Sequence, residues 1–403
     1  MNKDFNKFFS YYLSILLLFG IFFLYEKHTV GNDSTISEWI INYQGGFTKR
    51  GIIGQLSIYI TNFFKLDLRD VILIFQIFIL TVYFISLYFF FKDIKINKII
   101  ILSIFTPIFI LYPIAEIEVL ARKELFIFCS FLLYLSLNNR FKKNLYKLTL
   151  LPLIILIWEP AIFFFSFWLA VDILEKKIKK IDVKFFKILF SFVPALLVAT
   201  IIALNPISAE NHQIMVNFLK INFNENCYMS CAMLLSKASI YQQFYANFDS
   251  YSPIVFLRYT LIIILGFSPL FILNRYSLLN KNDFLFFKNF NNMLLPSIII
   301  LSPAITLFAM GSDWGRWVNI CYFFSIIFYF YLYKKKIIKL EEKILQNKFL
   351  LLFFKKNFFI VVFIIFCFGW NPKTSITGDV ATKPGYQIPR KAIKIIYYKY
   401  IKD

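Results

Sequence analysis

The chain has 403 residues, of which 59% are hydrophobic and 53 are phenylalanine, and its formal net charge is +21. This composition excludes a disordered chain and a water-soluble globular protein, and it is typical of an integral membrane protein. The basic residues lie in short segments between apolar runs rather than in a basic soluble domain. The charge therefore does not indicate a nucleic-acid-binding protein.

Apolar runs near the length that crosses a bilayer, roughly 17–25 residues, recur along the chain. We expect an all-α, polytopic helical membrane domain at 1–370 and a polar C-terminal tail at 371–403. The fold is predicted to have about nine to eleven spans, external amphipathic helices and one broken or re-entrant hairpin. The candidate runs are 8–25, 70–91, 99–113, 125–137, 188–204, 253–274, 293–310, 318–333 and 357–370, with an interrupted run at 148–174.

The first run, 8–25, follows two lysines and precedes no small-residue cleavage site, so we interpret it as a retained span with a cytoplasmic N-terminus. Alternation from there places more than half of the 44 lysines and arginines in cytoplasmic segments, as the positive-inside rule expects. The same alternation places the basic tail outside. The Phe, Ile, Lys and Asn bias suggests a bacterial genome, so we predict a multi-pass protein of the bacterial inner membrane.

The outer segment 26–69 is predicted to hold two short amphipathic helices. Thr35-Ile36-Ser37-Glu38 has the spacing of a capping box, so a helix should begin near Ile36. Its membrane-facing side should consist of Trp39, Ile40, Ile41 and Tyr43. Gly45-Gly46 should end this helix. A second amphipathic helix should then run from 51 towards 64.

Lys49 and Arg50 precede the start of this second helix, where free backbone amides and the helix dipole favour an anion. The two cations either bind a phosphate or extend to the membrane interface as structural cations. Asp33 and Glu38 are the outer acids nearest the first span. Each is a candidate catalytic acid or base, and otherwise Asp33 solvates a loop and Glu38 caps a helix.

Five charged residues crowd the outer junction at 116–124. Pairing of Arg122 with Glu118 at helical spacing would make this junction a structural lid. The alternative is that the charges face a wet cavity, because charges beside hydrocarbon are costly. Arg122 is therefore also a candidate phosphate ligand.

Glu159 is the most isolated charge of the chain and is followed by Pro160 in the run 148–174. Both flanks of this run are basic, and it is too short to cross twice, so we expect a hairpin that bends at Glu159-Pro160. An acid at membrane depth is a functional candidate, and burial would favour its protonated form. The alternative is a carboxylate that holds the bend by hydrogen bonds or by pairing with an arginine.

The motif Gly311-Ser312-Asp313-Trp314-Gly315-Arg316-Trp317 opens a later span on the outer side. Asp313 suits the first turn of a helix, whereas Arg316 opposes the helix dipole there and needs an anion beside it. Arg316 is a candidate phosphate ligand and Asp313 a candidate catalytic acid. Trp314 and Trp317 either belong to an interfacial aromatic belt or stack on a sugar ring.

Cys227 and Cys231 lie in a second outer segment, 205–252, where a disulfide and a free pair are both compatible with the sequence. No HExxH, paired CxxC, Asp-x-Asp or P-loop motif is present. We therefore expect no metal site and no cofactor.

The layout resembles integral-membrane glycosyltransferases that use lipid-linked sugar donors. The strings QGGFTKRG (44–51) and GSDWGRW (311–317) also look like segments of O-antigen-polymerase-like bacterial membrane proteins. The resemblance implies transfer or polymerisation of sugars from a polyprenyl-phosphate carrier at the outer face, with the lipid bilayer and the lipid-linked sugar as partners. It implies that Arg50 and Arg316 hold the phosphate or diphosphate leaving group, and that Glu159, Asp33 or Glu38 acts as acid or base.

Two other classes of protein fit the same sequence. A transporter or lipid flippase also uses broken helices and intramembrane acids, although we find no inverted repeat here. A non-catalytic assembly subunit would explain the absence of a sharp catalytic motif.

Overall fold

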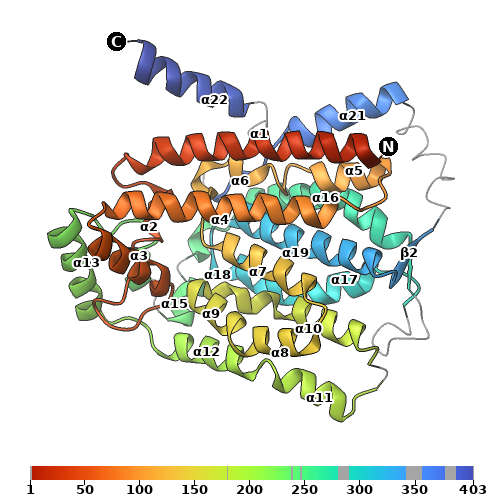
Figure 1. Cartoon of the computed structure of the whole chain (residues 1–403), viewed down its shortest axis with the longest axis horizontal. Coiled ribbons are helices and arrows are strands. Elements are labelled where there is room, and N and C mark those ends of the chain that lie inside the picture. The colour runs from red at the N-terminus through yellow and green to blue at the C-terminus, as the bar shows by residue number, and fades with distance from the viewer. Residues whose placement is uncertain are drawn as a thin grey trace.

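The structure is a computed structural model that describes residues 2–178, 180–236, 239–245, 247–279, 290–341, 356–376 and 387–402. These residues form a mostly helical bundle, which confirms the all-α class (Figure 1). Within the described residues, the extended structure in named strands is one antiparallel ribbon that pairs β1 (Ser277–Leu279) with β2 (Ile338–Leu340).

The elements of the first half, up to the second outer segment, are these: α1 (Asn2–His28), α2 (Ser34–Ser37), α3 (Gly51–Phe64), α4 (Leu68–Phe91), α5 (Lys98–Phe105), α6 (Tyr112–Ala115), η1 (Ile117–Val119), α7 (Glu124–Ser136), α8 (Arg140–Leu148), α9 (Leu150–Ile157), η2 (Glu159–Phe164), α10 (Phe165–Glu175), α11 (Val183–Phe190) and α12 (Val193–Leu204). Then follow α13 (Ala209–Phe223), α14 (Met233–Ser236), α15 (Ile240–Tyr245), η3 (Phe248–Ser250), α16 (Pro253–Arg275), α17 (Leu294–Leu301), η5 (Ser302–Ile305), α18 (Thr306–Met310), α19 (Trp314–Lys334), α21 (Lys356–Phe368), α22 (Gln387–Ile396) and the π-helical η7 (Tyr397–Ile401).

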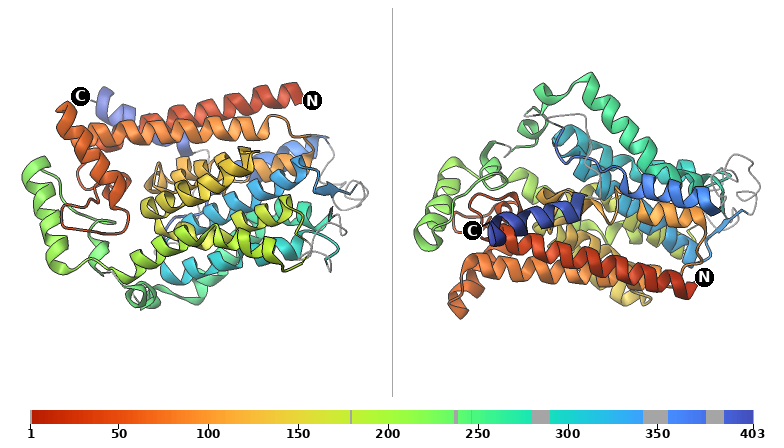
Figure 2. Two further views of the ribbon diagram at one scale, coloured as in Figure 1. Left: turned by 60° about the horizontal axis from the view of Figure 1, so that its bottom comes forward. Right: turned by 90° about the horizontal axis from the view of Figure 1, so that it is seen from above.

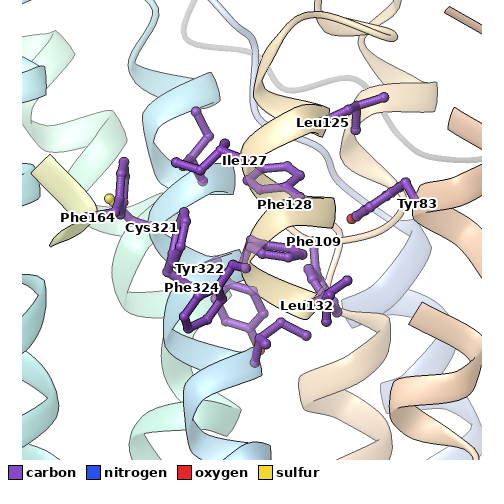
Figure 3. Close-up of a cluster of buried hydrophobic side chains, with 14 of the residues drawn as sticks. Tyr83, Phe109, Leu125, Ile127, Phe128, Leu132, Phe164, Cys321, Tyr322 and Phe324 are labelled. Carbon is purple, nitrogen blue, oxygen red and sulfur yellow. The ribbon is translucent and has the colours of Figure 1, made fainter. Parts of the chain in front are cut away.

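Helix α19 forms the centre of the bundle, because every residue from Trp314 to Leu332 is buried. A helix that is apolar on all sides belongs in such a position. Figure 3 shows Phe324 of α19 and Phe128 of α7 in this core. Phe128 stacks on Phe323 at 3.9 Å between ring centroids, and Phe164 of η2 stacks on Phe324 at 4.4 Å. The core thus fixes the hairpin and α7 against α19.

The bundle has two distinct ends. Helices α2, α3 and α13 gather at the left end in Figure 1, and the N-terminus and the β ribbon lie at the right end. Arg69 binds Glu225 at the first end, whereas Lys334 Nζ donates to the carbonyl of Phe90, 2.8 Å away, at the second. The segments predicted to be external therefore meet at one end, and segments predicted to be cytoplasmic meet at the other.

Among the residues that the structure describes, three helices are long and apolar enough to cross a bilayer: α1 from Asp4, α4 and α16. A fourth is added if α11 and α12, which meet at a bend of 44°, form one span. The described residues also contain shorter apolar helices, among them α3, α7 and the α17–α18 stretch. By length and composition these helices could cross a membrane, and the count of nine to eleven spans stays a prediction.

The run 148–174 forms the hairpin that the sequence predicts. Helix α9 ends at Ile157, extended backbone follows at Trp158, and α10 returns along the bundle. The two ends of the hairpin meet, because Lys147 Nζ lies 2.5 Å from Asp172 Oδ2. Glu159 consequently lies at the bend, at the end of the bundle that holds α2, α3 and α13. We call this the outer end, because the segments that meet there are those predicted to be external.

Part of the predicted tail packs against the membrane domain. Gly315 N donates to the carbonyl of Thr374 at 3.0 Å, and Ile376 N donates to the carbonyl of Ser312 at 2.9 Å. A Cβ on Gly315 would lie 1.9 Å from the carbonyl oxygen of Lys373, so this approach requires glycine. Residues 371–376 therefore support the start of α19. The later part of the tail lies elsewhere, because α22 packs on the outside of α1 (Figure 2, right).

Candidate functional site

The loop after α1 positions the first site residue, Glu38. Asp33 caps α2 by accepting from Thr35 N at 2.8 Å, so the helix begins two residues earlier than the capping-box prediction. The prediction that this helix continues to Gly45-Gly46 is wrong, because α2 ends at Ser37. Glu38 is the residue after α2 and does not cap its start. The prediction that residues 39–41 face the membrane is wrong, because Trp39, Ile40 and Ile41 are 0–1% exposed and pack in the core.

Glu38 is the centre of a buried charge network. Its carboxylate is fully buried and accepts from Arg122 at 3.1 Å and from the backbone N–H of Lys123 at 2.8 Å. Guanidinium nitrogens of Arg316 and Arg50 lie 3.7 and 3.8 Å away. Burial alone would raise the pKa of Glu38, but the three arginines together hold this pKa below its ordinary value. Glu38 is therefore a permanent anion that gathers arginines from three separate segments.

Arg50 joins the first outer segment to the hairpin. Its Nε and Nη2 each donate to Glu159 at 2.7 Å, a bidentate pair. Arg50 adopts left-handed backbone geometry, φ 64°, directly before α3, which confirms the predicted helix 51–64. This pairing favours the ionised form of Glu159, contrary to the protonated acid that burial alone predicts. It matches the alternative in which Glu159 holds the bend.

Arg316 makes the equivalent pair with Glu124. Both contacts are 2.7 Å, and both side chains are nearly fully buried. Arg316 Nη1 also lies 3.4 Å from Asp313 Oδ2, so the anion that Arg316 needs in the first turn of α19 comes mainly from α7. Pairing of Arg122 with Glu118 is absent, because Arg122 turns to Glu38 and to Asp313, 3.8 Å away.

Lys123 completes the network from the turn before α7. Its side chain is fully buried, and its Nζ donates to the carbonyl of Arg50 at 2.6 Å. Burial lowers the pKa of Lys123 to about 7, against the opposing effect of Glu38. Lys123 is therefore poised to change charge near neutral pH.

These residues border a cavity of about 230 Å³ at the outer end, which we call the outer cavity. Its charged lining consists of Lys49, Arg50, Arg122, Glu159, Asp313 and Arg316. Met229 and Ser230 from the second outer segment close one side, and Ser230 accepts from Arg122 at 3.1 Å. Nε of Arg122 is buried without a hydrogen-bond partner among the described residues.

The acids around the outer cavity are held to different degrees. Glu38 and Glu124 are buried in ion pairs, and Glu159 is locked to Arg50. Asp313 has a side chain that is 30% exposed, and its contacts with Arg316 and Arg122 are 3.4 and 3.8 Å long. Asp313 is thus the least constrained acid of the site.

The two candidate tryptophans lie in different surroundings, and one of them lines the outer cavity. Trp317 lines the outer cavity, with the Arg316 guanidinium 5.3 Å from its ring centroid. Trp314 does not line the cavity. It packs among Tyr251, Tyr259 and Phe308 and donates to the carbonyl of Phe308 at 2.7 Å. A sugar that enters the outer cavity would therefore meet Trp317 and not Trp314.

Asp33 and the cysteines lie outside the outer cavity lining. Asp33 pairs with Lys27 at 2.8 Å besides capping α2. Cys227 and Cys231 form a disulfide, one of the two states that the sequence allowed. Potential metal-binding atoms of His212, Cys227 and Cys231 lie within 4.8 Å of one another, but the disulfide removes both thiolates from coordination.

Sequence reasoning missed Glu124, Lys123 and Ser230 as parts of the site. Glu124 and Lys123 belong to the charged junction 116–124, so charge density beside an apolar run was the available signal. No local pattern pairs Glu124 with Arg316, because 192 positions separate them. Comparisons of the chain with protein-family models, with curated proteins and with solved structures gave no match.

Proposed function

We propose that this protein transfers or polymerises sugars from a polyprenyl-phosphate-linked donor at the outer face of a bacterial inner membrane, in surface-polysaccharide biosynthesis. In this proposal the N-terminus is cytoplasmic and the chain makes nine to eleven spans. The observation that carries the proposal is the outer cavity, in which candidates from four segments meet: Lys49 and Arg50, Arg122, Glu159, and Asp313 with Arg316.

The contacts favour Arg122 as the main phosphate ligand. Arg50 and Arg316 were expected to hold the phosphate, but carboxylates occupy two nitrogens of each fork. Arg122 lines the cavity and makes longer contacts, 3.1 Å with Glu38 and 3.8 Å with Asp313. Arg50 and Arg316 then supply positive field and fix Glu159 and Glu124, while Lys49 adds charge at the rim of the cavity.

The same contacts favour Asp313 as the general base. A base must reach the acceptor hydroxyl and must not be locked by a strong ion pair. Asp313 removes the proton as the hydroxyl oxygen bonds to the anomeric carbon. The bond between that carbon and the phosphate oxygen breaks, and the lipid phosphate leaves with the electron pair beside Arg122. Trp317, which lines the cavity, contacts the sugar.

Asp313→Asn tests this proposal, because it keeps the size of the side chain and removes its basicity. In a deletion strain, the variant should reduce the surface glycan made by the wild-type gene at least about a hundredfold, the lower range for loss of a general base. Glu118→Gln, a change of the same type at an exposed outer acid, is the control. Wild-type glycan in the Asp313→Asn strain, at matched protein level, would overturn the assignment.

A transporter or lipid flippase is the second candidate function. Two broken helical segments, α9–η2–α10 and α17–η5–α18, pack side by side through η2 and η5, and such breaks line transport sites in other folds. A lipid-linked sugar that moves across proteoliposomes containing only this protein, without glycosyl transfer, would favour this candidate. A structural assembly subunit would show neither activity and would tolerate Asp313→Asn.

A further inference from the structure

An apolar groove is formed by two segments that also line the outer cavity, namely the hairpin and the α17–α18 stretch. The groove has a volume of about 460 Å³, and we call it the α10–α17 groove. Its lining consists of Ser166, Leu169, Ala170, Ile173, Phe185, Phe290, Pro296, Ile299 and Ile300. Apart from Ser166 these side chains are apolar, whereas the outer cavity is rich in charge.

The cavity and the groove lie on one continuous face of the hairpin. Phe163 of η2 lines the cavity, and Ser166, Ala170 and Ile173 of α10 line the groove. These positions are separated by three, four and three residues, which is the spacing of one helical face. From Phe163 to Ile173 the helix advances about 15 Å.

The facing segment repeats this arrangement in the opposite direction. Met310 and Leu307 of α18 line the cavity, and Ile300 and Pro296 of α17 line the groove. Ala304, fully buried between them, falls on the same face. The two segments pack along their length, and Ser166 Oγ donates to the carbonyl of Ile300 at 2.5 Å where cavity gives way to groove.

We propose that the α10–α17 groove binds the hydrocarbon chain of the polyprenyl phosphate whose head group occupies the outer cavity. The inference rests on the proposed function and adds the chain-binding site. A seam that is cationic at one end and apolar along the next roughly two helical turns of α10 is complementary to a ligand with an anionic head and a long apolar tail. Ile299, 53% exposed, leaves the groove open towards the lipid.

A second apolar groove provides the internal comparison. It has a volume of about 580 Å³ and is lined by residues of α4, α7, α9 and α19, among them Leu133 and Tyr331. Its lining approaches that of the outer cavity at Phe126 of α7, four positions after Arg122, whereas its other end lies at Tyr331, about 21 Å of helix from Trp317. The α10–α17 groove differs because both of its walls, the hairpin and the α17–α18 stretch, also line the outer cavity.

The test uses the full-length protein in lipid nanodiscs and a polyprenyl phosphate that carries a photoreactive diazirine in its third isoprene unit. We expect cross-links to peptides containing 166–173 and 296–300, and we expect competition by unlabelled polyprenyl phosphate but not by phosphatidylglycerol. Ile299→Trp should lower the cross-linking yield at least fivefold. Leu133→Trp, an equivalent change in the comparison groove, should leave the yield unchanged.

Three results would overturn the proposal that the hydrocarbon chain binds in the α10–α17 groove: labelling of the α4–α7 region, equal competition by phosphatidylglycerol, or full labelling of Ile299→Trp. Because cross-linking measures binding, it separates this inference from the proposed function. Competed groove labelling in a protein without glycosyl transfer supports the lipid site and rejects transfer. Transfer with labelling only at α4–α7 keeps the function and rejects the α10–α17 groove.

Discussion

Removal of the central carboxylate by Glu38→Gln tests the physical account of the network. Glu38 is fully buried and faces Arg122, Arg316 and Arg50 at 3.1, 3.7 and 3.8 Å. The amide still accepts from Lys123 N–H but also places an NH₂ group among guanidinium groups. Breaking a buried ion pair by removing one partner typically costs about 3–5 kcal/mol, and we expect a loss of stability in that range.

Unfolding of the purified protein in detergent micelles measures this effect. Glu118→Gln, at an exposed outer acid, should change the free energy of unfolding by less than about 0.5 kcal/mol. The double variant Glu38→Gln/Arg122→Gln should recover part of the loss, because the two changes are coupled by about 0.5–3 kcal/mol. A Glu38→Gln protein as stable as the wild type would refute the reasoning, and strict additivity in the double variant would remove Arg122 from the network.

Three further outcomes follow from the outer end. Burial lowers the pKa of Lys123 from its ordinary 10.5 to about 7, so the folded state binds fewer protons than the unfolded state between these pH values. The free energy of unfolding should therefore rise with pH across that window, by at most about 1.4 kcal/mol per pH unit. Lys123→Met should flatten this slope, and an unchanged slope would contradict the burial of a neutral lysine. Gly45→Ala and Gly54→Ala should destabilise the fold, because the new Cβ at position 45 would lie 1.8 Å from the Asn211 carbonyl oxygen and that at position 54 would lie 2.0 Å from the Ile41 carbonyl oxygen. Gly31→Ala is the control, because a Cβ there would meet open space. Equal melting temperatures for the three variants would argue against this packing. An impermeant reductant should cleave the Cys227–Cys231 disulfide in intact cells, and only then should the freed thiols react with an impermeant maleimide. Labelling that requires lysis would reverse the predicted sidedness.

Local features of the fold were predictable from the sequence. Helix α3 begins at Gly51 as its turn residues indicate, and the hairpin bends at Glu159-Pro160 because basic flanks and an internal proline allow few alternatives. The prediction that residues 39–41 face the membrane failed for a physical reason. An apolar stripe indicates that a helix face is buried, but it does not show whether lipid or protein covers that face. Only the tertiary packing, in which Trp39 donates to the carbonyl of Ala121 at 3.1 Å, resolves the two.

The sequence predicted which residues lie at the site better than it predicted which of them pair with one another. Charge beside hydrocarbon singled out Arg50, Arg122, Glu159 and Arg316, and the structure brings these four residues to one cavity. Their partners depend on contacts across 109 and 192 positions, Arg50 with Glu159 and Arg316 with Glu124, which no helical spacing encodes. Glu38 illustrates the limit, since a residue that fits a helix cap in sequence becomes the anion that gathers three arginines in space.

The most direct test of the central claim, an anion site in the outer cavity, is the binding of a polyprenyl diphosphate to the purified full-length protein in nanodiscs. Arg122→Lys keeps the charge but loses the planar fork, and we expect at least tenfold weaker binding, about 1.4 kcal/mol. Arg69→Lys is the matched control, because Arg69 pairs with Glu225 at the same end but outside the cavity. Selective loss in Arg122→Lys supports the account, and equal affinity of Arg122→Lys and the wild type would contradict it.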